Sequence, residues 1–415
     1  MTRREWGLAS LVAIAVAGLA WQRGPALLRQ WLPPDPSPTV VDGLLVETVI
    51  GGLEHPWSVA FLSANQALIT ERSGRLRAAV WDADATGAVS QPGQLSAPLA
   101  GVPAVVAQGQ GGLFDVLPDR DFARNQRVYL SYAEADPEDP SRNGVAVMAA
   151  RLDQAGLRLT EQRVIFRQSP AVASSGHFGG RLVQRDDGSL LLTLGDRQRD
   201  DERGRAQDPT RDHGKVVRFL PDGRIPADNP FQGTSGVAVA SSGSRWQGRP
   251  WHWSLGHRNP QGAALHPLTG ELWISEHGPQ GGDEINRVLP GRNYGWPLVT
   301  RGCEYGSCEP IGRSRQAGME EPLTVWLPRS IAPSGLAFNT GGRYPGWEGQ
   351  LFSGALAGQA LWRLRVVDNR IVEREPLLAA LGERLRDVRL SPDGWLHVLT
   401  DSPHGRLLRL RPVAP

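Results

Sequence analysis

From about Leu44 onward, one short pattern recurs: an apolar strand runs into a turn of Pro, Asp or Gly, and a second strand ends in Thr, Ser or Gly. Asp-Gly between alternating apolar runs is a strong hairpin signal. The units lie around residues 59–62, 112–117, 181–193, 262–275, 335–338 and 387–400. Six hairpins at irregular intervals predict an all-β chain, folded as a six-bladed β-propeller with four-stranded antiparallel blades. A β-sandwich is the alternative, but it usually has fewer hairpin repeats.

The composition agrees with many short strands. The 49 Gly and 33 Pro among 415 residues are high for a helical protein, and no stretch long enough for a crossover helix has a clear 3.6-residue period. Hydrophobic residues make up 40% of the chain, which is ample for a packed core. The net charge is +2 and no basic stretch is interleaved with aromatic residues, so nucleic-acid binding has little support.

The N-terminal residues have the plan of an export signal or a membrane anchor. Arg3 and Arg4 precede an apolar run from Gly7 to Trp21, which is short for a membrane span of roughly 20 residues. We therefore expect residues 1–31 to direct export to the periplasm, or to anchor the protein at the inner membrane if they are not cleaved. Residues 32–41 are predicted to be a Pro-rich linker, and residues 42–415 the propeller domain.

The chain has two cysteines, Cys303 and Cys308. A lone pair at this short spacing suits a local disulfide in an oxidising compartment, in keeping with export. The alternative is a pair of reduced thiols in a loop. A zinc site is disfavoured, because there is no second cysteine pair and no histidine nearby.

Three short Gly- and Pro-rich segments combine groups that a purely structural loop does not need together. They are residues 256–262, 275–279 and 283–297. They contain carboxylates, free backbone carbonyls, a guanidinium and amides. Hard cations take oxygen ligands and anionic ligands favour forked donors, so this mixture indicates a site for both. The loops of several blades converge at one end of a propeller, which would bring distant segments into one site.

Four further motifs occur at residues 109–113, 177–182, 332–335 and 384–387. With the three loop segments, they resemble in content and order the soluble PQQ-dependent aldose sugar dehydrogenases, which are relatives of soluble glucose dehydrogenase. The similarity is spread over most of residues 50–402. No single motif is diagnostic, but their shared order is specific. The resemblance implies a six-bladed β-propeller with PQQ and calcium as cofactors.

The resemblance assigns the catalytic roles to His177 and Arg258. His177 would be the general base that accepts the hydroxyl proton while hydride leaves the adjacent carbon for the quinone. Arg258 would lie against the reactive quinone carbonyl and stabilise the developing oxyanion. Asn259 and Gln110 would hydrogen-bond along the cofactor edge. Taken alone, a single histidine is more often structural, and an arginine in a blade loop more often faces solvent.

The resemblance also implies two calcium sites. The backbone carbonyls of Gly278 and Pro279 would bind a calcium ion that also binds the cofactor and acts as a Lewis acid on the quinone. Glu284 and the carbonyl of Tyr294 resemble a second, structural calcium site, with Asp283 as a further member. Without the resemblance, Asp283 and Glu284 would be interpreted as a solvated acidic turn.

Arg384 and Arg386 alternate along a predicted strand, so their side chains point the same way and form a site for carboxylates. The resemblance puts both arginines on the carboxylates of PQQ, and Ser330 approximates a further cofactor contact. An exposed basic strand edge is the alternative. One position departs from the family: Ala357 stands where glucose-oxidising members have a lysine against the cofactor. Gln359 or an arginine could substitute.

The predicted function is oxidation of the anomeric carbon of aldose sugars to lactones, with electrons passing to an external acceptor that the sequence does not identify. The protein would be a monomer or a homodimer. Two other classes stay open. One is a metal-dependent lactonase on the same fold, which would centre its metal on side-chain carboxylates and amides. The other is a non-catalytic propeller that binds sugar or protein, an alternative that Ala357 keeps open.

Overall fold

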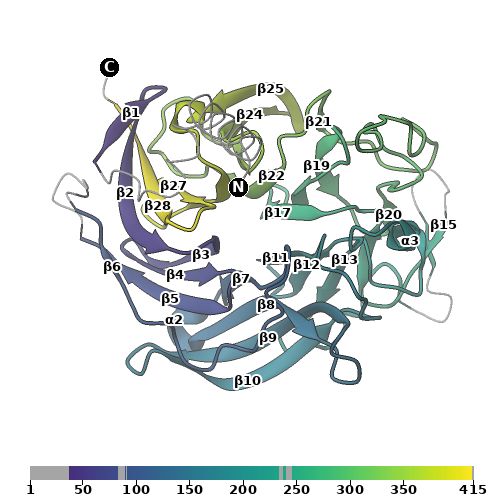
Figure 1. Ribbon diagram of the computed structural model, residues 1–415, viewed down its shortest axis with the longest axis horizontal. Coiled ribbons are helices and arrows are strands. Elements are labelled where there is room, and N and C mark those ends of the chain that lie inside the picture. The colour runs from purple at the N-terminus through teal and green to yellow at the C-terminus, as the bar shows by residue number, and fades with distance from the viewer. Residues whose placement is uncertain (1–36, 83–88, 90, 233–236, 240–244, 414–415) are drawn as a thin grey trace, which may run out of the picture.

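The computed structural model describes residues 37–82, 89, 91–232, 237–239 and 245–413. The predicted export signal or anchor lies outside these residues. Within them, no helix is long and apolar enough to cross a membrane. Six small sheets are arranged in a ring around a central axis (Figure 1), so the predicted six-bladed β-propeller is confirmed.

The blades follow chain order. The first two consist of β3 (Pro56–Ser63), β4 (Gln66–Glu71), β5 (Arg75–Val80) and β6 (Gln94–Leu95), then β7 (Leu113–Pro118), β8 (Arg127–Ala135), β9 (Asn143–Asp153) and β10 (Arg158–Arg167). The third contains β11 (Gly179–Gln184), β12 (Leu190–Leu194), β13 (Lys215–Phe219), β16 (His252–Leu255) and β20 (Arg292–Asn293). The fourth contains β17 (Pro260–Leu265), β18 (Leu272–Glu276), β19 (Asp283–Val288) and β21 (Thr324–Trp326).

The last two blades complete the ring. The fifth contains β22 (Pro333–Phe338), β23 (Leu351–Ala355), β24 (Leu361–Val367) and β25 (Arg370–Leu377). The sixth contains β26 (Leu385–Leu390), β27 (Leu396–Thr400), β28 (Gly405–Pro412), β2 (Leu44–Leu53) and β1 (Thr39–Val41). Because β2 pairs with β28, strands from both ends of the described chain close the last blade. A separate hairpin joins β14 (Val237–Val239) and β15 (Arg245–Gln247), and the helical elements are short: α2 (Phe122–Asn125), α3 (Asp200–Arg203), η1 (Gly204–Gln207) and η2 (Ala379–Leu381).

Four blades have the four strands predicted, and two have a fifth. In the sixth blade, the last residues of the predicted linker form β1, which Asp42-Gly43 turns back onto β2 with positive φ at both turn residues. In the third blade, β20 arrives from the chain that follows β19 and pairs in parallel with β16. This pairing joins segments far apart in sequence, so local alternation could not predict it.

The first strand of each blade lines the centre, and each of these six strands contacts the next around the ring. Hydroxyl groups connect neighbouring blades. Side chains of the second strands donate to backbone carbonyls in the first strand of the next blade: Thr70 to Phe114 (2.6 Å), Ser131 to Gly180 (2.5 Å), Thr193 to Pro260 (3.2 Å) and Ser275 to Ser334 (2.6 Å). Two of these donors, Thr193 and Ser275, end predicted hairpins, so the hydroxyl residues of the hairpin pattern help to hold the ring together.

Apolar clusters fill the spaces between blades. Between the first three blades, the rings of Trp57 and Phe114 lie 5.5 Å apart and those of Phe114 and Phe178 5.3 Å apart, all three buried. Each fully buried large side chain of this kind contributes about 1.5–3 kcal/mol. Cys303 and Cys308 form the predicted disulfide in the long connection between β20 and β21.

Candidate active site

The residues predicted for the site lie at one end of the ring, where the innermost strands begin. Gln110 precedes β7, His177 precedes β11, Arg258 and Asn259 precede β17, Ser330 precedes β22, and Arg384 precedes β26. The second strand of each blade is antiparallel to the first, so the segments that follow the second strands return to the same end. This geometry brings motifs more than a hundred residues apart into one region.

His177 is buried and held in a fixed orientation. Its Nδ1 lies 2.7 Å from Oδ1 of Asp196, and its backbone N–H donates to Oε1 of Gln110 at 2.9 Å. A carboxylate accepts, so the proton of the neutral imidazole belongs on Nδ1 and the lone pair on Nε2. Among the described residues, Nε2 has no hydrogen-bond partner. Burial lowers the pKa of His177 against the opposing charge of Asp196, and the charge of Arg258 adds to the lowering.

The turn at His177 requires the glycines that follow it. His177 has a φ of 43°, and Gly179 and Gly180 have φ values of 72° and 98°. A Cβ at Gly180 would lie 2.8 Å from the ring of Phe114, so a side chain there would both strain the backbone and displace the core. The two glycines thus place His177 immediately before β11 while the chain stays packed against Phe114.

Asp196 is a site residue that the sequence reasoning missed. It lies just beyond β12, and its carboxylate also accepts from the backbone N–H of Gln198 (2.8 Å) and from Nε1 of Trp296 (2.7 Å). Burial alone would raise the pKa of Asp196, but His177, Arg258 and the Gln198 N–H together hold it below its usual range. The residue before Asp196 could have drawn attention to it: a Cβ at Gly195 would clash with the carbonyl oxygen of His177, so only glycine fits next to this acid.

Arg258 is buried next to this pair. Its backbone carbonyl accepts from the N–H of Asp196 at 2.8 Å, and its own N–H donates to Glu276. Its Nη1 donates to the carbonyls of Gly278 (2.5 Å) and His277 (3.2 Å). Nε of Arg258 is buried without a hydrogen-bond partner among the described residues. An unpaired buried donor of this kind is costly unless a ligand oxygen accepts from it.

Asn259 presents a second unpaired donor. Its Oδ1 accepts from the N–H of Gly179 (3.3 Å) and from Nε2 of Gln261 (3.1 Å), while its Nδ2 is buried without a partner among the described residues. Gln110, which the sequence also placed at the cofactor, is exposed and connects the His177 backbone to Gln198 through a long contact of 3.4 Å. The two amides flank His177 from neighbouring blades.

Asp283 and Ser330 are hydrogen-bonded to each other. The Asp283 carboxylate accepts from the Ser330 hydroxyl (2.5 Å) and from the backbone N–H groups of Gly278 (2.8 Å), Ile331 (2.6 Å) and Ala332 (2.8 Å). Four donors satisfy its two oxygens. This geometry gives Asp283 a role in tying the Gly278 loop of the fourth blade to the Ser330 loop of the fifth.

Glu284 lies opposite Glu276 in the register of β18 and β19. Burial, followed by the charge of Glu276, raises the pKa of Glu284 to about 8. Its Oε2 accepts from Nδ2 of Asn286 at 3.1 Å.

The Tyr294 side chain is buried, stacks on His257 at 4.7 Å between ring centroids, and donates from its hydroxyl to the Arg287 carbonyl at 2.5 Å. In the part of the chain described, no group of three or more His, Cys, Asp or Glu side chains could hold a metal.

Arg384 and Arg386 lie on the same side, as their alternation predicts, and converge on a carboxylate that the sequence reasoning missed. Their Nη2 atoms lie 3.0 Å and 3.1 Å from Oδ2 of Asp401, which follows β27. Burial opposes ionisation of Asp401, but Arg386, His55 and Arg384 together hold its pKa well below its usual range. Arg386 is buried and Arg384 is largely exposed. The two arginines therefore form a cationic surface whose charge is partly neutralised by the Asp401 carboxylate.

The Ala357 segment lies beside these arginines. The carbonyl of Leu356 accepts from Nη1 of Arg384 at 3.4 Å, and the N–H of Ala357 donates to the Ile331 carbonyl at 3.0 Å. Ala357 is exposed. Ala357, which the resemblance pairs with a lysine of glucose-oxidising members, thus lies at the rim of the site, between the Ser330 loop and the arginine pair.

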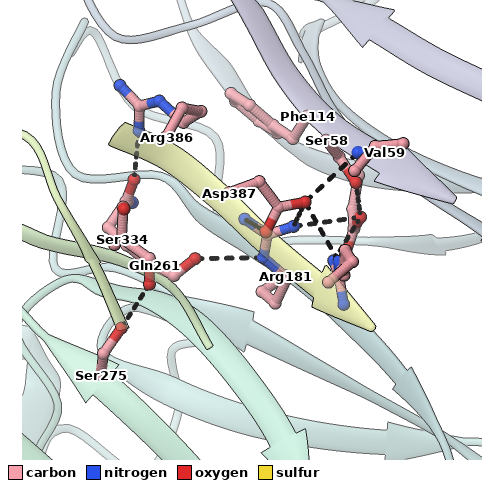
Figure 2. Close-up of polar contacts among 12 residues, drawn as sticks. Ser58, Val59, Phe114, Arg181, Gln261, Ser275, Ser334, Arg386 and Asp387 are labelled. Carbon is pink, nitrogen blue, oxygen red and sulfur yellow. Dashed lines mark hydrogen bonds and ion pairs between the residues drawn. The ribbon is translucent and has the colours of Figure 1, made fainter. Parts of the chain in front are cut away.

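Further along the inner strands, a buried charge network connects side chains from the first strands of several blades (Figure 2). Arg181 donates to the carbonyl of Gln261 (3.1 Å) and to the carboxylates of Asp115 and Asp387 (3.3 Å each), and its guanidinium lies 4.2 Å from the ring centre of Trp57. The side chain of Gln261 accepts from Arg386 at 3.2 Å. These contacts connect five blades and support the arginine pair at the site.

Comparison with known proteins identifies relatives. Residues 53–409 match the model of the Glucose / Sorbosone dehydrogenase family. The aldose sugar dehydrogenase YliI of Escherichia coli is 42% identical over 370 residues, 88% of this chain and 92% of the relative. The crystal structure of the soluble aldose sugar dehydrogenase of E. coli in its apo form is 42% identical, with a TM-score of 0.79 over 89% of this chain and 99% of that chain.

A third relative was solved with a cofactor. The PQQ-bound form of an aldose sugar dehydrogenase from Streptomyces coelicolor is 26% identical, with a TM-score of 0.68 over 92% of this chain and all of that chain. The family match spans most of the described propeller, including every predicted site residue. The chain therefore belongs to the Glucose / Sorbosone dehydrogenase family and is an oxidoreductase.

Proposed function

We propose that the protein is a PQQ- and calcium-dependent dehydrogenase that oxidises the anomeric carbon of aldose sugars to lactones. The observation that carries the proposal is the pairing at one end of the ring: a buried imidazole with its Nε2 unpartnered among the described residues, oriented by Asp196, beside the buried guanidinium of Arg258. The PQQ-bound relative supports the choice of cofactor.

The donors at the site fit PQQ, an anionic, oxygen-rich molecule. Nε of Arg258 and Nδ2 of Asn259 are buried and unpaired within the described residues, and Arg384 and Arg386 form a cationic surface suited to carboxylates. Ser330, which is committed to Asp283, would act by shaping the loop. When bound, PQQ would supply the acceptor for the two electrons and the hydrogen removed from the anomeric carbon.

The residues of the chain would handle the proton and the charge. His177 would take the anomeric hydroxyl proton at Nε2, and the Asp196 carboxylate would stabilise the imidazolium that forms. Arg258, fixed by the Gly278 and His277 carbonyls, would stabilise negative charge that develops on a neighbouring oxygen. Loss of the hydroxyl proton and of the hydrogen on the same carbon converts the cyclic hemiacetal into a lactone.

The calcium proposal has unequal support at its two sites. Glu284 faces Glu276, and its raised pKa signals an uncompensated buried carboxylate that a cation would stabilise together with the Tyr294 carbonyl. At the other site, the Gly278 carbonyl already accepts from Arg258 at 2.5 Å, so a calcium ion there would lie close to a guanidinium. Pro279 would have to provide its carbonyl alongside further oxygens from the cofactor and water.

Location and partners are part of the same proposal. Export is supported by the Cys303–Cys308 disulfide and by the signal-like N-terminus. The substrate would be an aldose, the electron acceptor an external molecule, and the protein a monomer or a homodimer. The uncleaved-anchor alternative rests on the N-terminal sequence alone.

The direct test is an absorbance titration of the purified, metal-stripped protein with PQQ in the presence and absence of calcium, followed by addition of an aldose panel. The proposal expects a bound-quinone spectrum that is reduced by aldoses, with release of the lactone. His177→Ala should bind PQQ but not reduce it. Binding without reduction by the wild-type protein would favour the non-catalytic propeller, and failure to bind PQQ would reject the proposal.

A further inference from the structure

Trp296 contacts both the carboxylate that orients His177 and the guanidinium of Arg258. Its Nε1 donates to Oδ2 of Asp196 at 2.7 Å, on the oxygen opposite the one that faces His177. The guanidinium carbon of Arg258 lies 5.2 Å from the centre of its ring. The side chain is 5% exposed, so these contacts are made in a desolvated environment where they are strongest.

The position of Trp296 is set by the extra strand of the third blade. β20 leaves the fourth blade, pairs with β16, and delivers Trp296 three residues later. There, the Trp296 N–H donates to the Gly256 carbonyl at 2.9 Å, and its own carbonyl accepts from Nε2 of Gln207 at 2.7 Å. The fifth strand, which the hairpin pattern did not predict, is thus the element that carries this indole into the site.

We propose that Trp296 is a positioning residue that couples the general base to the anion-stabilising arginine. The proposal rests on the function proposed above for His177 and Arg258. The indole N–H can only donate, so it occupies Oδ2 and leaves Oδ1 for the imidazole. That contact fixes the rotation of the carboxylate and hence the tautomer of His177. The face of the same ring attracts the guanidinium of Arg258.

The test compares Trp296→Phe with Trp253→Phe. Trp253 is a matched control: it is 7% exposed, its ring lies 5.0 Å and 5.3 Å from the guanidinium groups of Arg185 and Arg218, and its Nε1 has no hydrogen-bond partner among the described residues. Both variants lose an indole N–H and part of an aromatic face near arginine. Only Trp296→Phe removes a donor from Asp196.

The first measurement is proton NMR of the cofactor-free protein. The short His177–Asp196 hydrogen bond should give a downfield Nδ1–H resonance, assigned by its loss in His177→Ala. We expect Trp296→Phe to broaden or shift this resonance and Trp253→Phe to leave it unchanged. The second measurement is turnover with PQQ, calcium and an aldose. We expect kcat to fall roughly 10- to 150-fold in Trp296→Phe, as for loss of one hydrogen bond to a charged group.

An unchanged resonance in Trp296→Phe, or an equal change in Trp253→Phe, would overturn the inference. If Trp296→Phe does not fold, Trp296→Tyr keeps an aromatic face but has no N–H at the Nε1 position, and the same outcomes apply to it. The resonance does not depend on sugar oxidation. A wild-type protein that shows the resonance, loses it in the variant and oxidises no aldose would reject the proposed function while leaving the positioning role intact.

Discussion

Replacing Asp196 with asparagine keeps the shape of the side chain and removes one acceptor. In the native protein, Oδ1 accepts from His177 Nδ1 and the Gln198 N–H, and Oδ2 accepts from Trp296 Nε1. An amide has one acceptor oxygen and one donor NH₂ group. In either orientation of the introduced amide, its NH₂ group faces at least one of these donors. The amide can also donate to Nδ1 of His177 if the imidazole moves its proton to Nε2, which would remove the base from the site.

The expected loss follows from these contacts. A hydrogen bond to a charged group contributes about 1.5–3 kcal/mol, and each 1.4 kcal/mol corresponds to about tenfold, so kcat should fall roughly 10- to 150-fold from one lost bond alone. PQQ affinity should change little, because Asp196 lies behind His177 and does not face the arginine pair. Steady-state turnover with excess PQQ and calcium, together with a PQQ titration, separates the two quantities.

A matched control lies outside the site. Asp212 is a buried carboxylate that accepts from His252 Nε2 (3.0 Å), Trp251 Nε1 (2.9 Å) and the Ser169 N–H (2.7 Å). Asp212→Asn should lower the melting temperature as much as Asp196→Asn does, but leave kcat unchanged. If Asp196→Asn retains kcat within about threefold, or if both variants lose activity in proportion to stability, the role given to Asp196 is refuted.

Three further outcomes are expected. His177→Ala should retain PQQ binding and lose about a hundredfold to ten-thousandfold in turnover; near-normal oxidation would contradict the general base. Because the pKa of Glu284 is raised, the metal-free protein should lose stability as the pH rises from 4.5 through about 8, by about 2–3 kcal/mol after allowance for partial exposure. Glu284→Gln should therefore flatten the pH dependence of the melting temperature and abolish stabilisation by calcium. A calcium effect that survives in this variant would place the ion elsewhere. Ala357→Lys should tighten PQQ binding about tenfold, and weaker binding in a calcium-loaded titration would reject its assigned position.

The hairpin pattern predicted the fold because each blade is built from local pairing. A turn such as Asp187-Gly188 sits between two apolar runs, and alternation along each run determines which side chains face the neighbouring blade. The closing pair β2–β28 and the parallel strand β20 were not predicted, because each joins segments that are distant in sequence. The hairpin of β1 did have its signal, Asp42-Gly43, but the prolines before it favoured a linker.

The predicted site residues were found from motifs, and the missed ones lie outside motifs. His177 and Arg258 stand in glycine-rich segments, whereas Asp196 and Asp401 are single acids after ordinary strands. Asp283 shows what a motif does not reveal: its oxygen-rich context predicted a metal ligand, which stays a prediction, while its carboxylate accepts from backbone N–H groups and from Ser330. Which acids are already satisfied depends on loop contacts between blades, and these are not visible in local sequence.

The missed acids nevertheless follow a rule that the propeller itself explains. In three blades a hydroxyl residue at or next to the end of the second strand is followed at once by an acid, as in Thr70-Glu71, Ser275-Glu276 and Thr400-Asp401, and in the third blade Asp196 comes three residues after Thr193. Where the hydroxyl bonds to the next blade, it fixes the strand end, and the acid that follows must emerge at the end of the ring where the first strands begin. Three of the four acids meet a cationic or imidazole group there: Glu276 meets His257, Asp401 meets Arg384 and Arg386, and Asp196 meets His177. Glu71 instead pairs with Arg75 and Arg77 of its own blade. The same strand geometry that closes the ring therefore supplies His177, His257 and the arginine pair with their carboxylates.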